Sequence, residues 1–308
     1  MPAIVTLTLN PTIDGSSEAE LVRPVHKVRT SNERYDPGGG GINVARVVRE
    51  LGGDALAICL AGGTTGPVLD ALLAEHAVPR RLVAIAGPTR ISHTVFEQSS
   101  GQEFRFVPEG PHLSPAEVRA CLDAVAAVEC AYFVASGSLP PGAPEDLLAQ
   151  AGRIAAGRGA RFVLDSSGAG LKGTLGAAPV HLVKPSLGEL TALVGRELPD
   201  AASQEAAATE LVASGAAEMV ALTLGHDGAI LASRDGIQRA AALDVPVRSA
   251  VGAGDSFLAA MVCALAQGRP PREAFLRGIA GGTAAVLTPG TELAHRADVE
   301  RLYRQLTG

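Results

Sequence analysis

Short apolar runs alternate with longer stretches of helical periodicity along most of the chain. The apolar runs predict strands at 3–9, 55–60, 131–135, 161–164, 180–183 and 218–224. Each run is nearly continuous, as expected for a strand whose two sheet faces are both covered by helices. The periodic stretches predict helices at 42–51, 66–77, 144–158, 187–194, 255–267, 272–287 and 297–306. This alternation predicts an α/β fold with a doubly wound, mostly parallel sheet flanked by helices.

Two segments, 13–35 and 91–107, interrupt this rhythm and lack helical periodicity. The second predicts a hairpin, with strands at 93–98 and 103–107 around Ser99-Ser-Gly-Gln102. We therefore expect residues 1–308 to form one α/β domain with a small inserted β-sheet lid, made of 13–36 and 91–108. Such a lid would exclude water from a reactive site. The alternative is an antiparallel extension of the main sheet's edge with no gating role.

The composition supports a large core and limits the classes of ligand. Hydrophobic residues make up 47% of the 308 residues and charged residues 19%, which disfavours disorder. The net charge of −6 argues against a nucleic-acid or membrane surface, because both attract basic patches. A phosphorylated ligand would therefore be held by a few local cations.

Cysteine usage and hydropathy predict a compartment. Cys59, Cys121, Cys130 and Cys263 are scattered without metal-ligand spacing, which favours buried free thiols in a reducing environment over disulfides or a zinc site. The first nine residues are typical of a strand rather than a signal peptide, and no stretch is long and apolar enough for a membrane span. We expect a cytoplasmic protein.

Two glycine-rich segments each run into an apolar helical stretch: Asp36-Pro-Gly-Gly-Gly-Gly-Ile-Asn-Val-Ala-Arg46 and Val251-Gly-Ala-Gly-Asp-Ser-Phe257. Backbone N–H groups in such a loop, together with the helix N-terminus, favour a bound anion. Gly252, Ala253 and Gly254 would stabilise a transferring phosphoryl group, and Asp255 would accept the proton of an attacking hydroxyl.

Two other interpretations of the second segment stay open at this point. An isolated Asp at a helix start more often serves as an N-cap. The Gly252-Ala-Gly254 run also partly resembles a dinucleotide fingerprint, but Phe257 replaces its last small residue and the run lies near the C-terminal end. A Rossmann cofactor site, and with it a dehydrogenase, is therefore disfavoured.

Further motifs fall in one family's order: Thr8-Leu-Asn-Pro-Thr-Ile-Asp14, Ser136-Gly-Ser-Leu-Pro-Pro-Gly142, Val163-Leu-Asp-Ser-Ser-Gly168 and Lys184-Pro-Ser-Leu-Gly-Glu189. With the two glycine-rich segments, they make essentially the whole chain resemble the ribokinase/PfkB carbohydrate kinase family. The resemblance implies a ribokinase-like fold and ATP-dependent phosphorylation of fructose 6-phosphate at the 1-hydroxyl, a step of glycolysis giving fructose 1,6-bisphosphate and ADP. Gly40 favours that branch, because related 1-phosphofructokinases and tagatose-6-phosphate kinases usually carry Lys there.

The resemblance also implies a sugar site formed by Asp14, Lys27, Gly38, Gly39, Asn43, Arg90 and Ser138. Asp14 would hydrogen-bond sugar hydroxyls, and the two glycines would also serve as a hinge for the lid. Arg90 and Lys27 would neutralise the phosphate already on the substrate. Read alone, these two cations would be solvated surface charges, and Ser138 would be a turn residue.

On the nucleotide side, the resemblance implies contacts from Lys184, Ser186, Thr223, Gly225, Gly228 and Thr283. The Thr223-Leu-Gly-His-Asp-Gly228 segment would bring a glycine turn to the phosphates, although alone it would be a hairpin turn. Glu189 matches the acid that organises Mg²⁺ through water, and Asp165 is a second candidate for the metal region. Ser186 departs from the family's usual Asn.

A monovalent-cation loop is implied at Ser249, Val251, Ala285 and Gly290, which makes K⁺ a candidate cofactor beside Mg²⁺, with ATP as co-substrate. Thr288, Glu292 and Ala250 depart from the more usual Asn, Arg and Thr at their positions.

The same residues leave several alternative functions open and predict a homodimer. The rivals are a tagatose-6-phosphate kinase or 1-phosphofructokinase, a kinase for nucleosides or unphosphorylated sugars, and a catalytically silent sugar-phosphate sensor. The expected partners are a small phosphosugar and ATP. Apolar lid residues would pack against a second subunit and form a homodimer: Val95, Phe96, Phe104 and Phe106.

Overall fold

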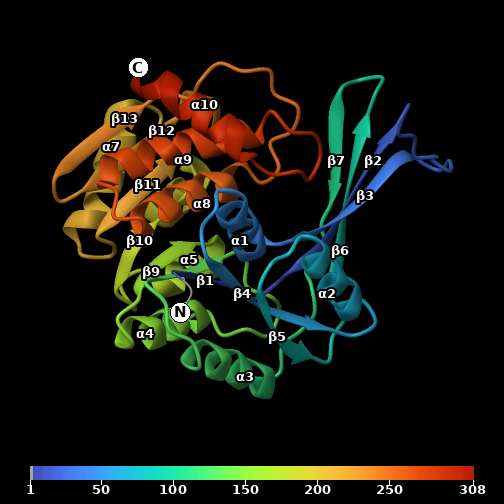
Figure 1. Cartoon of the computed structure of the whole chain (residues 1–308), viewed down its shortest axis with the longest axis horizontal. Helices are drawn as coiled ribbons and strands as arrows, with labels where there is room; N and C mark the ends of the chain where they lie inside the picture. Colours follow the sequence, from blue (N-terminus) through green and yellow to red (C-terminus); the bar gives the residue numbers. More distant parts are fainter. Residues whose placement is uncertain (1–2) are drawn as a thin grey trace.

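The computed structural model describes residues 3–308 and arranges them around two sheets of unequal size (Figure 1). The larger sheet contains β1 (Ile4–Thr8), β4 (Ala55–Gly62), β5 (Arg80–Ile85), β8 (Tyr132–Ser136), β9 (Arg161–Asp165), β10 (Val180–Val183), β11 (Met219–Thr223), β12 (Ala229–Ser233) and β13 (Gly236–Ala240). Their order is β13-β12-β11-β10-β9-β8-β1-β4-β5. Seven strands are parallel, and only β12 and β13 run antiparallel to their neighbours. The predicted doubly wound, mostly parallel sheet is confirmed.

Helices cover both faces of this sheet. One face carries α1 (Gly40–Glu50), α2 (Gly66–Glu75), α8 (Ala253–Ala266), α9 (Pro271–Ala285) and α10 (Arg296–Thr307), which share one apolar core. The other face carries α3 (Pro115–Ala126), α4 (Leu147–Gly157), α5 (Gly168–Thr174) and α7 (Ala201–Ala213). Helix α6 (Leu187–Val194) joins a smaller cluster with β11 and β12. Two covered faces explain why the strands are continuous apolar runs.

The second sheet contains β2 (Thr12–Ala19), β3 (Ser31–Gly38), β6 (Arg90–Glu97) and β7 (Gln102–Phe106), in the order β3-β2-β6-β7. The predicted hairpin is present as the antiparallel β6–β7 pair, while β2 and β6 run parallel. This sheet projects from the helical body as a separate layer (Figure 1). The alternative of an extension along the main sheet's edge was wrong.

The cysteines and the helix lengths can be compared with the expectations from the sequence. All four cysteines are buried and free, as predicted. Among residues 3–308, no helix has both the length and the apolar character needed to cross a bilayer.

The strand order reverses at β1, which lies between β8 and β4. Chain segments that leave the carboxyl ends of β1 and β8 therefore diverge, and in open α/β sheets such a point forms the ligand crevice. The motifs singled out in the sequence follow these strand ends and those of β9, β10 and β11.

Candidate active site

The start of α8 carries the second glycine-rich segment. Gly252 is the N-cap residue, with φ 71° and ψ 3°, and a side chain there would collide with Leu293. No side chain caps this helix, and its start offers backbone N–H groups to an anion, of which that of Ala253 donates to the Ala250 carbonyl at 3.4 Å. Asp255 lies within that turn, and its Oδ2 accepts a hydrogen bond from Asn43 Nδ2 at 2.9 Å. The N-cap interpretation of Asp255 was therefore wrong.

The protonation of Asp255 suits proton transfer near neutral pH. Burial raises its pKa to about 6 and the Asp165 charge adds to this, while the Asn43 hydrogen bond and Lys184 act against it. A carboxylate with this pKa is mostly ionised at neutral pH and still accepts a proton readily. The geometry and the pKa both agree with a general base.

A buried ion pair lies beside the start of α8. Lys184 Nζ is 3.1 Å from Asp165 Oδ1, and Ser136 Oγ donates to Asp165 Oδ2 at 3.2 Å. Burial alone would lower the pKa of Lys184, but the Asp165 carboxylate outweighs it and keeps the pKa above its ordinary value. A methyl group added at Gly254 would be 3.4 Å from Lys184 Nζ. This ammonium group therefore adds positive charge directly at the open helix start.

The first glycine-rich segment joins Asp14 to Asp255. Ser92 Oγ donates to Asp14 Oδ1, and burial raises the pKa of Asp14. Gly38 lies so close to Asp14 that a β-carbon would overlap its carboxylate, and Gly39 has φ 106°, a conformation that favours glycine. Asn43, one turn into α1, then reaches Asp255.

Arg90 borders a cavity of about 540 Å³ whose lining also includes Glu109, Ser138 and Gly142. Its Nη1 and Nη2 donate to the carbonyls of Pro108 and Asn10, both at 2.9 Å. Within residues 3–308, its buried Nε has no hydrogen-bond partner. The lining is mostly apolar and also includes Glu145, and Arg90 is its one cation. A guanidinium fixed in this position offers a contact for a phosphate group.

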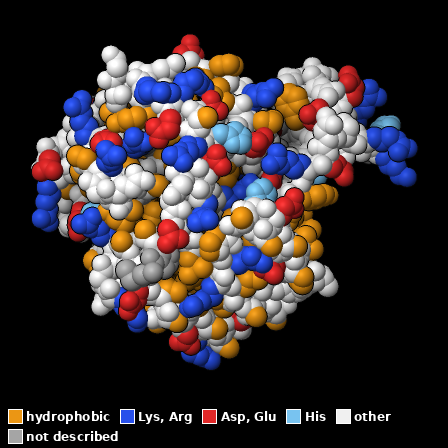
Figure 2. Space-filling model, in the orientation of Figure 1, with side chains coloured by type: hydrophobic (Ala, Val, Ile, Leu, Met, Phe, Trp, Pro, Cys, Tyr) orange, Lys and Arg blue, Asp and Glu red, His pale blue; other side chains and the backbone are white. Residues whose placement is uncertain are grey.

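Lys27 is not near Arg90 within one chain. It is exposed in the loop after β2, whose Thr12 pairs with Arg90 and whose Ala19 pairs with Glu97 at the other end. Seven strand residues separate these ends by about 23 Å, at a rise of roughly 3.3 Å each. Positive side chains gather at this outer end of the second sheet (Figure 2). The sequence interpretation missed this separation because it depends on the pairing of β2 with β6.

The nucleotide candidates follow β10 and β11. Ser186 caps α6: its Oγ accepts from Glu189 N at 3.3 Å, and Glu189 Oε2 accepts from Ser186 N at 2.8 Å. Thr223 ends β11 beside Ser186 and donates its N–H to the Pro185 carbonyl. The remaining candidates are Gly225 and Gly228, which flank a short turn with φ 62° and 96°, and Thr283, which is buried in α9.

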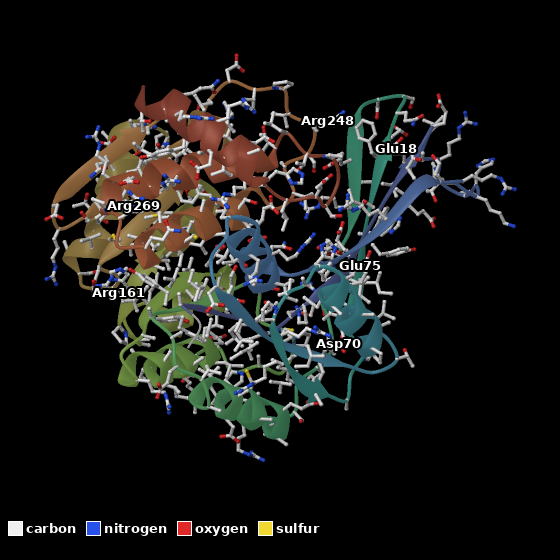
Figure 3. The ribbon with its side chains drawn as sticks, in the orientation of Figure 1. Glu18, Asp70, Glu75, Arg161, Arg248 and Arg269 are labelled. Atoms are coloured by element: carbon white, nitrogen blue, oxygen red, sulfur yellow. The ribbon has the colours of Figure 1, made fainter. Side chains whose placement is uncertain are left out.

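The candidate cation loop joins the segment before α8 to the end of α9. Arg248 N donates to the Val286 carbonyl at 2.8 Å, and Figure 3 shows Arg248 between the helices and the second sheet. Ser249 Oγ accepts from Val251 N, and the Ala285 carbonyl accepts from Thr288 Oγ1 at 2.7 Å. Gly290 has φ 59°. These are neutral oxygen donors, and across residues 3–308 no three His, Cys, Asp or Glu side chains form a metal cluster.

Three polar groups at the site were missed as functional candidates. Ser92 pairs opposite Asp14, but that register is set by the parallel β2–β6 pair and left no local pattern. Ser136 and Asp36 do stand inside quoted motifs. The available signal was that Ser136 directly precedes Gly137 and that Asp36 opens the first glycine-rich segment.

Comparison with known proteins gives the chain's relatives. An ATP-dependent 6-phosphofructokinase isozyme 2 of Mycobacterium tuberculosis is 44% identical over 98% of this chain and 89% of its own length. The protein of the same name from Escherichia coli is 40% identical over the full length of both chains. A 1-phosphofructokinase of Xanthomonas campestris is 36% identical over 85% of this chain and 83% of its own length.

Crystal structures of the Escherichia coli phosphofructokinase-2 match the whole chain. The complex with potassium has a TM-score of 0.96 at 39% identity, and the complex with fructose-6-phosphate has a TM-score of 0.94 at 38% identity. A tetrameric inhibited form of that protein matches equally well, with full coverage of both chains in each case. The model of the pfkB family of carbohydrate kinases matches residues 8–297, so this chain belongs to that family.

Proposed function

We propose that this protein transfers the γ-phosphoryl group of ATP to the 1-hydroxyl of fructose 6-phosphate, giving fructose 1,6-bisphosphate and ADP. The observation that carries this proposal is Asp255, ionisable near pH 6, at the uncapped start of α8 and hydrogen-bonded to Asn43. Family membership as a carbohydrate kinase and the names of the full-length relatives support the reaction.

In the proposed reaction, the substrate's 1-hydroxyl oxygen attacks the γ-phosphorus and its proton passes to Asp255. Asn43 holds Oδ2, which leaves Oδ1 to accept that proton. As the new P–O bond forms, the bond between the γ-phosphorus and the oxygen of ADP breaks. The amides of Gly252, Ala253 and Gly254 at the uncapped helix start stabilise the transferring group, so catalysis consists mainly of placement and electrostatics.

Lys184 adds a fixed positive charge to this end of the nucleotide site, which Ser186, Thr223 and the glycine turn would border. Glu189 and Asp165 are the carboxylates available to hold Mg²⁺, chiefly through water, since this ion keeps much of its hydration. Few protein ligands are then required, which fits the carboxylates present. Bound Mg²⁺ would supply charge compensation to the phosphates.

The sugar would lie against the first glycine-rich segment. Asp14, Asn43 and Ser138 offer hydrogen bonds to its hydroxyls, and Gly38 and Gly39 allow close backbone approach. The 6-phosphate would face Arg90 at the cavity. A charged group placed for a phosphate disfavours nucleosides and unphosphorylated sugars as substrates.

We propose a homodimer in which the second sheets pair. Phe106 is 58% exposed and shares one face of the β6–β7 pair with Val95 and Phe104, an apolar surface that a partner would cover, whereas Phe96, 37% exposed, lies on the opposite face. Lys27, far from Arg90 of its own chain, would then reach the substrate phosphate of the partner. The second sheet would serve as the lid over the site.

Two finer assignments complete the proposal. Oxygen donors at Ser249, Val251, Ala285 and Gly290 fit a monovalent cation such as K⁺, which would act beside the α8 start. Four buried free thiols agree with the reducing cytoplasm.

A substrate panel with purified protein tests the function. ADP formation is measured with fructose 6-phosphate, tagatose 6-phosphate, fructose 1-phosphate and fructose, and the highest kcat/KM is expected for fructose 6-phosphate. Equal or better turnover of another sugar would replace the proposed substrate. Tight sugar-phosphate binding without ADP from any of them would support a sensor instead.

A further inference from the structure

Asp36, near the end of β3, is a buried carboxylate that the proposed reaction does not use. Only 1% of it is exposed. Its two oxygens contact Arg34 Nε at 2.8 Å, Arg46 Nη2 at 3.2 Å, His76 Nε2 at 3.2 Å and Thr291 Oγ1 at 2.6 Å. Pairing and hydrogen bonds of this kind offset the cost of burying a carboxylate.

These partners tie the second sheet to three other parts of the fold. Arg46 belongs to α1, and its Nη1 also donates to the Pro37 carbonyl at 3.0 Å, which fixes the backbone directly before Gly38. His76 follows α2; burial and the Arg46 charge lower its pKa, so near neutral pH the uncharged ring donates to Asp36. The cluster therefore fixes the entry to the sugar site's glycines.

Thr291 belongs to the 289–293 loop between α9 and α10, and this loop contacts the second sheet at three points. Thr291 donates to Asp36, and Glu292 Oε2 is 3.4 Å from Arg34 Nη1. At Gly290, an added methyl group would be 3.2 Å from Ser16 Oγ of β2.

The same loop contacts the start of α8 on its other side. Leu293 fills the space into which a side chain on Gly252 would project, and it is itself buried. Thr288 Oγ1 lies within hydrogen-bond distance of the Ala285 and Glu292 carbonyls, at 2.7 and 2.8 Å, which holds the loop against the end of α9. A displacement on the sheet side would therefore reach the N-cap residue of α8 through packed atoms.

We propose that Asp36 and Thr291 are positioning residues that couple the sugar site to the phosphoryl-transfer site through the 289–293 loop. This inference rests on the proposed function. Sugar-phosphate binding repositions β3 and Asp36, Thr291 follows its acceptor, and Leu293 adjusts the position of Gly252. By reciprocity, each substrate changes the affinity of the other by one common factor. The coupling factor between the two substrates is the quantity that tests this proposal.

The test is a calorimetric measurement of the Kd of a non-hydrolysable ATP analogue, with and without saturating fructose 6-phosphate. The wild-type ratio of the two Kd values should differ from one by about fivefold or more, in the usual range of coupled sites. Thr291→Val keeps the shape and removes the hydroxyl donor, and should bring the ratio to within about twofold of one. Thr174→Val is the matched control: that hydroxyl is buried and bonded within α5, so the wild-type ratio should persist.

Asp36→Asn extends the test, with circular dichroism to establish folding. This variant should also bring the ratio of the two Kd values to within about twofold of one, as Thr291→Val does. Should Asp36→Asn fail to fold, Thr291→Val alone decides. A wild-type ratio of one, or a wild-type ratio retained in Thr291→Val, would overturn the coupling even in an active enzyme. A wild-type protein that forms no ADP from fructose 6-phosphate would instead overturn the proposed function, and the inference with it.

Discussion

The nine-stranded sheet and the four-stranded sheet contribute to the candidate site in different ways. Beside the larger sheet, Lys184 is buried and paired with Asp165 at 3.1 Å, and Asp255, partly buried at the start of α8, accepts a hydrogen bond from Asn43. The smaller sheet supplies Asp14 and Arg90 at its base, but its outer loop is exposed and basic (Figure 2). We infer a division of labour: the rigid sheet end performs chemistry, and the projecting sheet recognises the substrate's phosphate.

The largest effect should come from the chemical side. Asp255→Asn removes the proton acceptor while keeping the Asn43 contact nearly isosteric, so kcat should fall about 10²–10⁴-fold with little change in KM. Steady-state assay of ADP release measures it, with Asp235→Asn in the exposed β12–β13 turn as control. Near-normal turnover would remove Asp255 from its role.

Arg90→Gln tests the recognition side. Loss of a charge-assisted contact is worth about 1.5–3 kcal/mol, so KM for fructose 6-phosphate should rise roughly 10–150-fold while kcat is largely kept. Arg304→Gln, an exposed arginine on α10, should leave both constants unchanged. A fall in kcat with KM unchanged would break the proposed division between the two sheets.

The pH profile sharpens the same contrast. The active form of Asp255 is ionised and its pKa is raised to about 6, so kcat/KM is full above that pH and lost as pH falls through it. Below it the decline should be about tenfold per pH unit. An acid limb near the ordinary carboxylate pKa would mean that the buried, desolvated environment of Asp255 is not retained in the working enzyme.

The smallest effect concerns the outer loop. Lys27→Met should raise KM by up to about tenfold, as expected for one exposed charge at the phosphate. With fructose 6-phosphate well below the wild-type KM, mixing equal amounts of Lys27→Met and Asp255→Asn chains should restore about a quarter of the wild-type rate, because random pairing gives that share of intact sites in a symmetric dimer.

Activity that stays at the level of the two separate variants would show that Lys27 does not serve a partner's site. Light scattering on the wild-type protein accompanies this measurement, since a monomer would exclude the exchange altogether.

The sequence predicted what depends on local patterns. Continuous apolar runs identified six of the seven parallel strands, and the helices at 187–194 and 272–287 are found within two residues of those bounds. Strand β5 was missed because it opens with two arginines and leaves an apolar run of only four residues, 82–85, and α5 was missed because it is short and begins at a glycine. Helix α7 lacks a marked apolar face, and β12 and β13 return antiparallel where the pattern suggested a turn only.

The site divides in the same way. Asp255, Lys184 and Asp14 stand at strand or helix ends that motifs mark, so their gathering was predictable. The Asn43–Asp255 hydrogen bond spans 212 residues and the Thr291–Asp36 contact 255, and no local signal reports such pairs. Lys27 was assigned beside Arg90 from the sequence, but its distance from Arg90 within one chain depends on the register of β2 with β6.

The smaller sheet is formed by two separate segments of the chain. Strands β2 and β3 follow β1 of the larger sheet, whereas β6 and β7 follow β5. Four chain connections therefore join the smaller sheet to the rest of the fold. The parallel pairing of β2 with β6 joins the two segments to each other. A single backbone cut in the outer loop at residues 20–30 would leave all four of these connections intact. A tag or a fluorescent reporter inserted in that loop away from Lys27 would therefore leave the sheet attached.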